Sequence, residues 1–284
     1  MAKFRLKGVP RVGDFPTAVD LVMMVAIIVA AQVVMSLIGA WLGLPMPEMF
    51  SGDIVDIEHY IDIQVVRGNS FAVIYPLSMI LAAAGLYLYI WARDGRGKVS
   101  RGSLKGLEPN VILGGVVWLI AMQIVVEPLS VLLPEASQPQ SQGLWAIVTA
   151  VVFAPVFEEF IFRGIILESL LRRHRRMVSV VVSAALFAIV HFQPSVVFTA
   201  FVSGLVLGTI YLHTNSIFAT IILHSINNAV AYSLITLNVD DYTFRGLFGD
   251  GRLYYTVYGV SLVIAIVAVV RTWRRRRRRV TDKP

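Results

Sequence analysis

Eight apolar segments, most of them near the roughly 20 residues that a helix needs to cross a membrane, restrict the folds open to this chain. They are residues 18–43, 71–92, 111–133, 144–171, 178–193, 195–212, 216–237 and 253–273. In hydrocarbon every backbone polar group must be bonded within the protein, which favours helices. The sequence therefore predicts an all-α fold, a polytopic membrane helical bundle of about eight transmembrane helices, forming a single integral membrane domain over residues 1–284.

Composition supports this interpretation and excludes several kinds of chemistry. The chain is 57% hydrophobic and only 15% charged, whereas ordinary soluble domains carry about 25% charged residues. It contains no cysteine, so disulfides, thiolate nucleophiles and zinc–thiolate sites are excluded. The first apolar segment is longer than the roughly 7–15 apolar residues of a cleavable signal peptide. We therefore expect it to be a retained transmembrane helix.

Two parts of this map need a local interpretation. The fifth and sixth segments are short and are separated by Gln193 and Pro194. Proline disfavours helical geometry in the residue before it, so we expect two short helices joined by a tight turn. Between the first two segments, the stretch DIVDIEHYIDIQVV, residues 53–66, mixes charged residues with Ile and Val. We expect a packed loop there, with an interfacial helix as the alternative.

The basic residues predict the topology. Nearly all of the 25 Lys and Arg residues lie before the first segment, in alternate connections, or after the last segment. By the positive-inside rule both termini are then cytoplasmic. The polybasic tail, residues 274–284, begins with six consecutive arginines, and such juxtamembrane clusters bind anionic lipid. No aromatic residues are interleaved to support nucleic-acid binding.

Three charged residues lie inside the fourth apolar segment, namely Glu158, Glu159 and Arg163. A charge at the membrane centre costs about 2.5–3.5 kcal/mol, so such residues usually face the protein interior and are functional. Adjacent helical positions are about 100° apart, so the two carboxylates diverge, while Arg163 lies one turn after Glu159 and should pair with it. Glu158 is left without a local partner and suits a general base. The alternative is a purely structural buried ion cluster.

Two later segments each contribute a histidine. His191 ends the fifth segment, with Phe187 four residues before it on the same helix face. His224 lies inside the seventh segment with Asn228 four residues later, whereas Asn227 points elsewhere. At 1.5 Å per residue the depths of these side chains are compatible with one cavity that opens to the cytoplasm. The alternatives are an interfacial His191 and an interhelical clasp of His224 with Asn228.

One carboxylate, two imidazoles and an amide suit the activation of water. Either Glu158 and His191 deprotonate a water directly, or Glu158, His191 and His224 hold a metal, plausibly Zn²⁺, that lowers the pKa of its bound water. His224 and Asn228 could instead donate hydrogen bonds to a developing oxyanion. The sequence has no GxSxG motif and no paired aspartates within the apolar segments, which disfavours serine and aspartyl mechanisms.

The same residues fall into three short motifs, EEFIFR (158–163), FAIVH (187–191) and HSINN (224–228). Together they resemble the EExxxR, FxxxH and HxxxN motifs of the CPBP family. That family includes CAAX prenyl endoproteases of the Rce1 type and bacteriocin-processing or immunity (Abi) proteins. The resemblance covers residues 110–240, which would form the catalytic core.

The resemblance implies an intramembrane endopeptidase in which Glu158 activates water with His191 beside it. The residues that would support or complete the site are Glu159, Arg163, His224 and Asn228. The family is usually classed as metalloproteases, although a metal-free glutamate mechanism is also proposed for it. The expected partners are the lipid bilayer and a peptide or membrane-protein substrate, prenylated at its C-terminus in the CAAX branch. We expect a multi-pass protein of a prokaryotic plasma membrane.

Two other functions remain open on the sequence. A non-catalytic membrane scaffold or bacteriocin self-immunity protein could bind a partner through the same polar cavity. A proton- or ion-coupled transporter could use intramembrane Glu and His as a relay. Transporters often contain inverted repeats, and the sequence shows no repeat, which disfavours a transporter.

Overall fold

The computed structural model describes residues 15–44, 57–94, 103–104, 107–130, 132, 143–191, 194–237, 243–249 and 251–281. Within these ranges the chain is helical and has no β-strand, which confirms the predicted all-α fold. The helices are α1 Ala18–Trp41, α2 Ile57–Asp94, α3 Pro109–Ser130, α4 Leu144–Val148, α5 Ala154–Glu159, α6 Glu168–Leu171, α7 Arg176–Ile189, α8 Pro194–Thr214, α9 Ile217–Thr236, α10 Phe244–Phe248 and α11 Arg252–Thr281. Two π-helical stretches, η2 Thr149–Phe153 and η3 Phe160–Leu167, join α4, α5 and α6.

Seven of the described helices are long and apolar enough to cross a membrane, and α7 is an eighth, shorter apolar helix of 14 residues. Large apolar side chains on their outer faces are exposed, among them Leu37, Trp41, Leu113 and Val263. A soluble protein rarely exposes so much contiguous apolar surface. The chain is therefore an integral, multi-pass membrane protein, as its composition predicts.

Helix α2 begins earlier than the sequence analysis predicts. The stretch 53–66 is predicted to form a packed loop, but from Ile57 it is helical and continues directly into the membrane-spanning part of α2. That prediction is wrong because the interspersed acidic residues do not interrupt the helix, which contains no proline before Pro76. Residues 45–56 lie outside the described residues.

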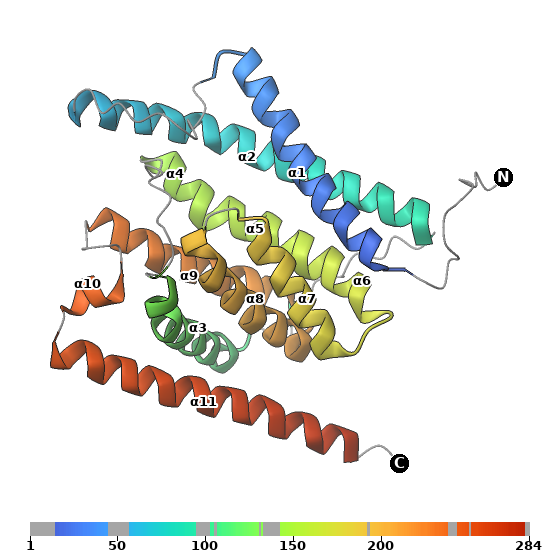
Figure 1. Ribbon diagram of the computed structural model, residues 1–284, viewed down its shortest axis with the longest axis vertical. Coiled ribbons are helices and arrows are strands. Elements are labelled where there is room, and N and C mark those ends of the chain that lie inside the picture. The colour runs from blue at the N-terminus through green and yellow to red at the C-terminus, as the bar shows by residue number, and fades with distance from the viewer. Residues whose placement is uncertain are drawn as a thin grey trace.

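The helices form a bundle with two flanks (Figure 1). α1 and α2 pack against each other on one flank, and α11 packs against α3 on the other. The helix that runs from Leu144 to Leu171 lies between them and contacts α2, α7 and α9. α1 begins and α11 ends at the same side of the bundle, in agreement with the predicted even number of crossings.

Helices α7 and α8 approach very closely. A Cβ atom on Gly204 would lie 2.9 Å from the Cα atom of Ala184, and one on Gly208 would lie 3.1 Å from Val180 Cγ1. Small residues at this spacing allow two membrane helices to touch through their backbones. Gly204 and Gly208 thus form a small-residue face on α8. α7 ends at Ile189 and α8 begins at Pro194, so the fifth and sixth apolar segments are two separate helices, as predicted.

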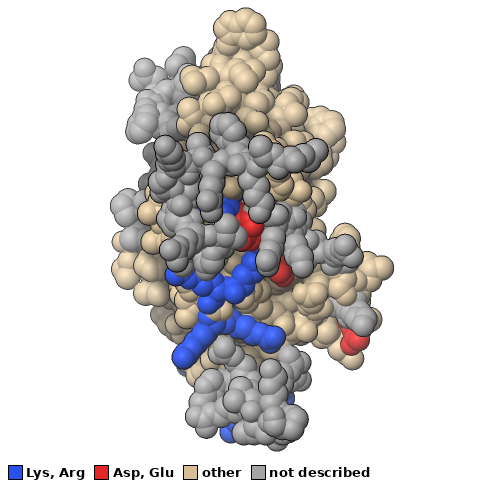
Figure 2. Space-filling model, turned by 90° about the vertical axis from the view of Figure 1, so that its right-hand side faces the viewer, with Lys and Arg blue, Asp and Glu red and all other residues tan. Residues whose placement is uncertain are grey.

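Polar contacts fasten α1 and α2 to the end of the central helix. Buried Asp20 accepts a hydrogen bond of 2.7 Å from Tyr89 and pairs with Arg93 at 2.7 Å. Arg172, just after α6, pairs with Asp94 at 2.6 Å. Figure 2 shows Lys and Arg side chains gathered on this face of the molecule. These contacts therefore hold α1 and α2 in a fixed position along the helix Leu144–Leu171.

Candidate active site

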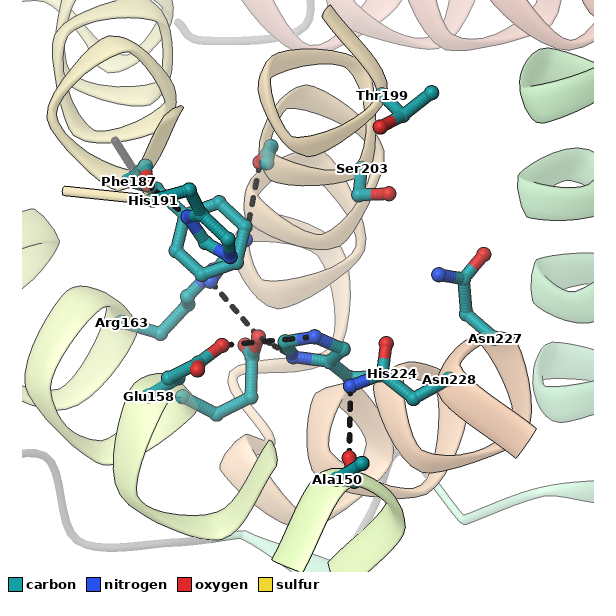
Figure 3. A network of polar contacts seen from close by, with 12 residues as sticks. Ala150, Glu158, Arg163, Phe187, His191, Thr199, Ser203, His224, Asn227 and Asn228 are labelled. Carbon is teal, nitrogen blue, oxygen red and sulfur yellow. Dashed lines mark hydrogen bonds and ion pairs between the residues drawn. The ribbon is translucent and has the colours of Figure 1, made fainter. Parts of the chain in front are cut away.

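The two adjacent glutamates differ in their surroundings, as their helical spacing predicts. Glu159 is completely buried and its Oε1 atom lies 2.8 Å from Arg163 Nη1, one turn later on the same helix. The predicted pairing of Glu159 with Arg163 is therefore confirmed. The same Oε1 atom lies 2.9 Å from Nδ1 of His224, which joins α9 to this pair. Figure 3 shows the side chains of Arg163, His224 and Glu158 pointing toward one another.

Glu158 has no partner on its own helix but has two on other helices. Its Oε1 atom accepts a hydrogen bond of 2.6 Å from the hydroxyl group of Tyr75 on α2. Its Oε2 atom lies 3.7 Å from Nε2 of His224, which is beyond direct hydrogen-bond distance. The side chain of Glu158 is 13% exposed, whereas that of Glu159 is 0% exposed. Glu158 is thus the less enclosed carboxylate of the pair.

The contact between His224 and Glu159 determines which nitrogen of the imidazole ring is the donor. A carboxylate can only accept, so Nδ1 of His224 must donate to it. In the neutral ring the other nitrogen, Nε2, is then a hydrogen-bond acceptor. With a neutral ring, Nε2 of His224 and Oε2 of Glu158 are two acceptors separated by 3.7 Å. A contact of this length between polar atoms suits a bridging water, and a water can donate to both.

The backbone beside the glutamates is π-helical on both sides of α5. Such stretches are rare and occur often at functional sites. The amide of Ala154 bonds to the carbonyl of Thr149, and Pro155 has no N–H group to offer the carbonyl of Ala150. The side chain of Asn228 donates to that carbonyl at 2.9 Å instead. Asn228 therefore supplies the donor that Pro155 lacks, and its hydrogen bond links α9 to the helix that carries Glu158.

Phe187 on α7 lies between His191, which follows α7, and His224 on α9. Its ring lies edge-on to His191 at 4.7 Å and to His224 at 5.7 Å between ring centroids, and the guanidinium of Arg163 stands 4.9 Å above it. The Nδ1 atom of His191 lies 2.7 Å from the carbonyl oxygen of Phe187. This places His191 over Phe187 (Figure 3), and no hydrogen bond or ion pair joins it to Glu158 within the described residues.

A second polar group lies on the α3 side of the same helices. The amide of Gln123 donates to Ser203 Oγ at 2.5 Å and to Asn227 Oδ1 at 3.4 Å. Asn227 therefore points away from His224, as predicted from the helix geometry and as Figure 3 shows. Sequence reasoning missed Gln123 and Ser203, although a glutamine within an apolar segment is a signal of an interhelical contact.

The predicted metal ligands are not gathered into one ligand set. Among the residues that the structure describes, no group of three or more His, Cys, Asp or Glu side chains is arranged to hold a metal ion. Glu158 and His224 face each other, while His191 is turned toward the backbone of α7. The arrangement does not fit a three-ligand zinc site of Glu158, His191 and His224. No observation tests whether the protein binds Zn²⁺ in another way, and that part of the sequence analysis stays a prediction.

The structure brings four of the six predicted site residues, Glu158, Glu159, Arg163 and His224, into one network across α5, η3 and α9. Asn228, one turn after His224, bonds separately to the carbonyl of Ala150 in η2. His191 touches that network through the ring of Phe187. The sequence analysis missed Tyr75. The only signal for it is a hydroxyl-bearing aromatic residue next to a proline within an apolar segment, which many membrane helices share.

Comparison with protein families gives one match. Residues 139–230 match the family model described as Type II CAAX prenyl endopeptidase Rce1-like. The matched segment contains all three motifs, and the resemblance to the CPBP family drawn from them is confirmed over these residues. Comparisons with curated proteins and with solved structures gave no significant match. The match supports a membrane protease of the CAAX type.

Proposed function

We propose that this chain is an intramembrane endopeptidase that hydrolyses peptide bonds of membrane-associated substrates, with Glu158 as the general base. The single observation that carries the proposal is the gap of 3.7 Å between Glu158 Oε2 and His224 Nε2. A carboxylate oxygen and an imidazole nitrogen at that distance suit a water molecule that is held between them for deprotonation. The family match of residues 139–230 supports the same reaction class.

The proposed reaction is a hydrolysis by an activated water. The water donates one proton to Glu158 while its oxygen attacks the carbonyl carbon of the scissile peptide bond and forms a tetrahedral intermediate. The intermediate then collapses, the C–N bond breaks, and Glu158 returns the proton to the leaving amine. General acid–base catalysis of this kind contributes about 10²–10⁴-fold to the rate.

The other residues have supporting roles in this proposal. Glu159 and Arg163 hold the ring of His224 so that Nε2 faces the water. Asn228 uses one of its two amide protons on the carbonyl of Ala150, and the second remains to donate to the oxyanion of the intermediate. His191 lies on the far side of Phe187, so its proposed role is to line the substrate path rather than to contact the water.

The proposed substrate is a peptide whose end reaches the site within the membrane. All the network residues lie on membrane-spanning helices, so a soluble loop would have to enter hydrocarbon to be cleaved. A peptide with a lipid-modified C-terminus, as the name of the matched family indicates for its members, would arrive already anchored. We therefore propose prenylated C-terminal peptides as the first substrate class to test.

The test compares Glu158→Gln with Glu168→Gln in purified full-length protein. Glu168 is a matched control, because it lies on the same helix and accepts a hydrogen bond of 2.6 Å from Tyr211. The substrate is a farnesylated CAAX-terminal peptide, beside its unprenylated form, with products read by mass spectrometry. We expect Glu158→Gln to lose at least about 100-fold in kcat and Glu168→Gln to remain active.

Two outcomes would count against the proposal. Cleavage by Glu158→Gln at the wild-type rate would remove Glu158 as the base. If well-folded wild type cleaves neither peptide, the observation favours the non-catalytic scaffold or self-immunity function, in which the same network only shapes a binding cavity. A chelator arm tests the zinc prediction, because a mechanism that uses Glu158 alone predicts an unchanged rate after metal removal.

A further inference from the structure

Tyr75 reaches the candidate site from outside the part of the chain that matches the protease family. It lies on α2, far from the matched residues 139–230 in sequence, and 83 positions separate it from Glu158. Its hydroxyl group nevertheless makes the shortest contact of Glu158, 2.6 Å to Oε1. A hydrogen bond to a charged acceptor at this distance is strong and strongly oriented.

The backbone of α2 holds Tyr75 in place. The next residue, Pro76, cannot donate a backbone hydrogen bond and restricts the local backbone. The hydroxyl group of Ser78 donates to the carbonyl of Tyr75 at 2.7 Å. The ring of Phe71, one turn earlier, packs against the ring of Tyr75 with 5.1 Å between their centroids. Tyr75 thus has packing and backbone contacts within its own helix that do not involve Glu158.

The two carboxylate oxygens of Glu158 consequently have separate functions. Oε1 is held by Tyr75, and Oε2 is turned toward Nε2 of His224 across the gap that suits a water. Glu158 has no other hydrogen-bond or ion-pair partner among the described contacts. Without the tyrosine hydroxyl the carboxylate could rotate about its side-chain torsions, and Oε2 would leave the position from which it takes the proton.

We propose that Tyr75 is a positioning residue that orients Glu158 for catalysis, so that α2 completes the active site. This inference rests on the proposed function, because it assigns Tyr75 a role through the general base. It extends the active site beyond the matched segment. Two ion pairs hold α2 in position along the bundle, Asp20 with Arg93 and Asp94 with Arg172. In this proposal they also help to position Tyr75 at the site.

The chain contains a matched control for this contact. The hydroxyl group of Tyr211 donates to Glu168 Oε1 at 2.6 Å, the same length and the same pair of residue types. Glu168 lies on the same continuous helix as Glu158. The hydrogen bonds that the structure describes for His224 and Asn228 go to Glu159 and Ala150 and not to Glu168. Tyr211→Phe therefore removes an equivalent hydrogen bond without touching the candidate base.

The experiment measures kcat, KM and Tm for Tyr75→Phe, Tyr211→Phe and Glu158→Gln in full-length protein reconstituted in lipid. The probe is the farnesylated CAAX-terminal peptide. Phenylalanine keeps the ring and removes only the hydroxyl group. Because a displacement of about 1 Å in a catalytic group can cost 100-fold, we expect Tyr75→Phe to lower kcat by about 10- to 100-fold. KM should stay within about twofold, and Tm should match that of Tyr211→Phe.

The outcomes separate this inference from the proposed function. A normal kcat for Tyr75→Phe, beside an inactive Glu158→Gln, would overturn the role of Tyr75 and leave the function intact. A loss of kcat that comes with a lower Tm than Tyr211→Phe, or with failure to fold, would give Tyr75 a structural role and also overturn it. An active Glu158→Gln would instead overturn the proposed function itself.

Discussion

Arg163 is a fully enclosed cation whose contacts are all within the protein. Its guanidinium meets Glu159 Oε1 at 2.8 Å, the carbonyl oxygen of Gly204 at 3.3 Å and the ring of Phe187 at 4.9 Å. Taking a charge out of water is expensive, and only partners of this kind offset the cost. The residue therefore holds η3, α7 and α8 together around the carboxylate that orients His224.

Replacing Arg163 with methionine should destabilise the protein strongly. Glu159 would be left as a buried charge without its cation, and breaking such a pair from one side costs about 3–5 kcal/mol. Thermal unfolding in detergent is the measurement, with Arg176→Met as the control because Arg176 is exposed at the start of α7. An unchanged Tm for Arg163→Met would show that Glu159 does not need this cation.

The pair of helices α7 and α8 depends on direct backbone contact. Gly204 meets the backbone of Ala184, so the two helices cannot separate without also moving the carbonyl that Arg163 uses. Gly204 thus both packs α8 against α7 and provides a carbonyl oxygen that accepts a hydrogen bond from Arg163. In membranes the association of helices rests on such close packing, because lipid is as apolar as the side chains.

Gly204→Ala should therefore destabilise the protein, whereas Gly114→Ala should not. The new Cβ atom at position 204 would meet backbone at 2.9 Å, while the one at position 114 would meet no atom within 4 Å. Overpacking a tight contact costs about 1–3 kcal/mol, and alanine is favoured over glycine inside a helix by about 1 kcal/mol. Equal Tm values for the two variants would contradict the close contact of α7 with α8.

For the whole molecule, the distribution of basic residues predicts which side of the bundle faces the cytoplasm. α1 begins, α2 ends and α11 ends on one side, and the turn after α6 with Arg172, Arg173, Arg175 and Arg176 lies on the same side (Figures 1 and 2). The positive-inside rule assigns this side to the cytoplasm. The cytoplasmic termini, the prokaryotic plasma membrane and the binding of anionic lipid by residues 274–284 stay predictions.

The absence of cysteine allows a direct test of this orientation. Leu104, before α3, and Leu247, on α10, are both exposed, and each can be replaced with cysteine as the only thiol of the chain. We expect a membrane-impermeant maleimide added outside intact cells to label Leu247→Cys alone. Leu104→Cys should react only after the membrane is opened. Labelling of Leu104→Cys in intact cells would reverse the assigned topology.

The sequence by itself determined what depends on near neighbours. Apolar length located the membrane helices, and a spacing of four residues predicted the pairing of Glu159 with Arg163 and the contact of Phe187 with His191. The same local reasoning missed the helical start of α2 and the π-helical stretches around α5, since several backbone patterns suit one apolar sequence.

Only the tertiary structure decided which side chain reaches Glu158. The hydrogen bond from Tyr75 depends on how α2 packs against α5, and the approach of His224 depends on how α9 packs against the same helix. Neither relation follows from periodicity, because hydropathy shows which residues avoid water but not which helices become neighbours. The local environment of the candidate base is therefore set by helix packing, over separations that no spacing rule covers.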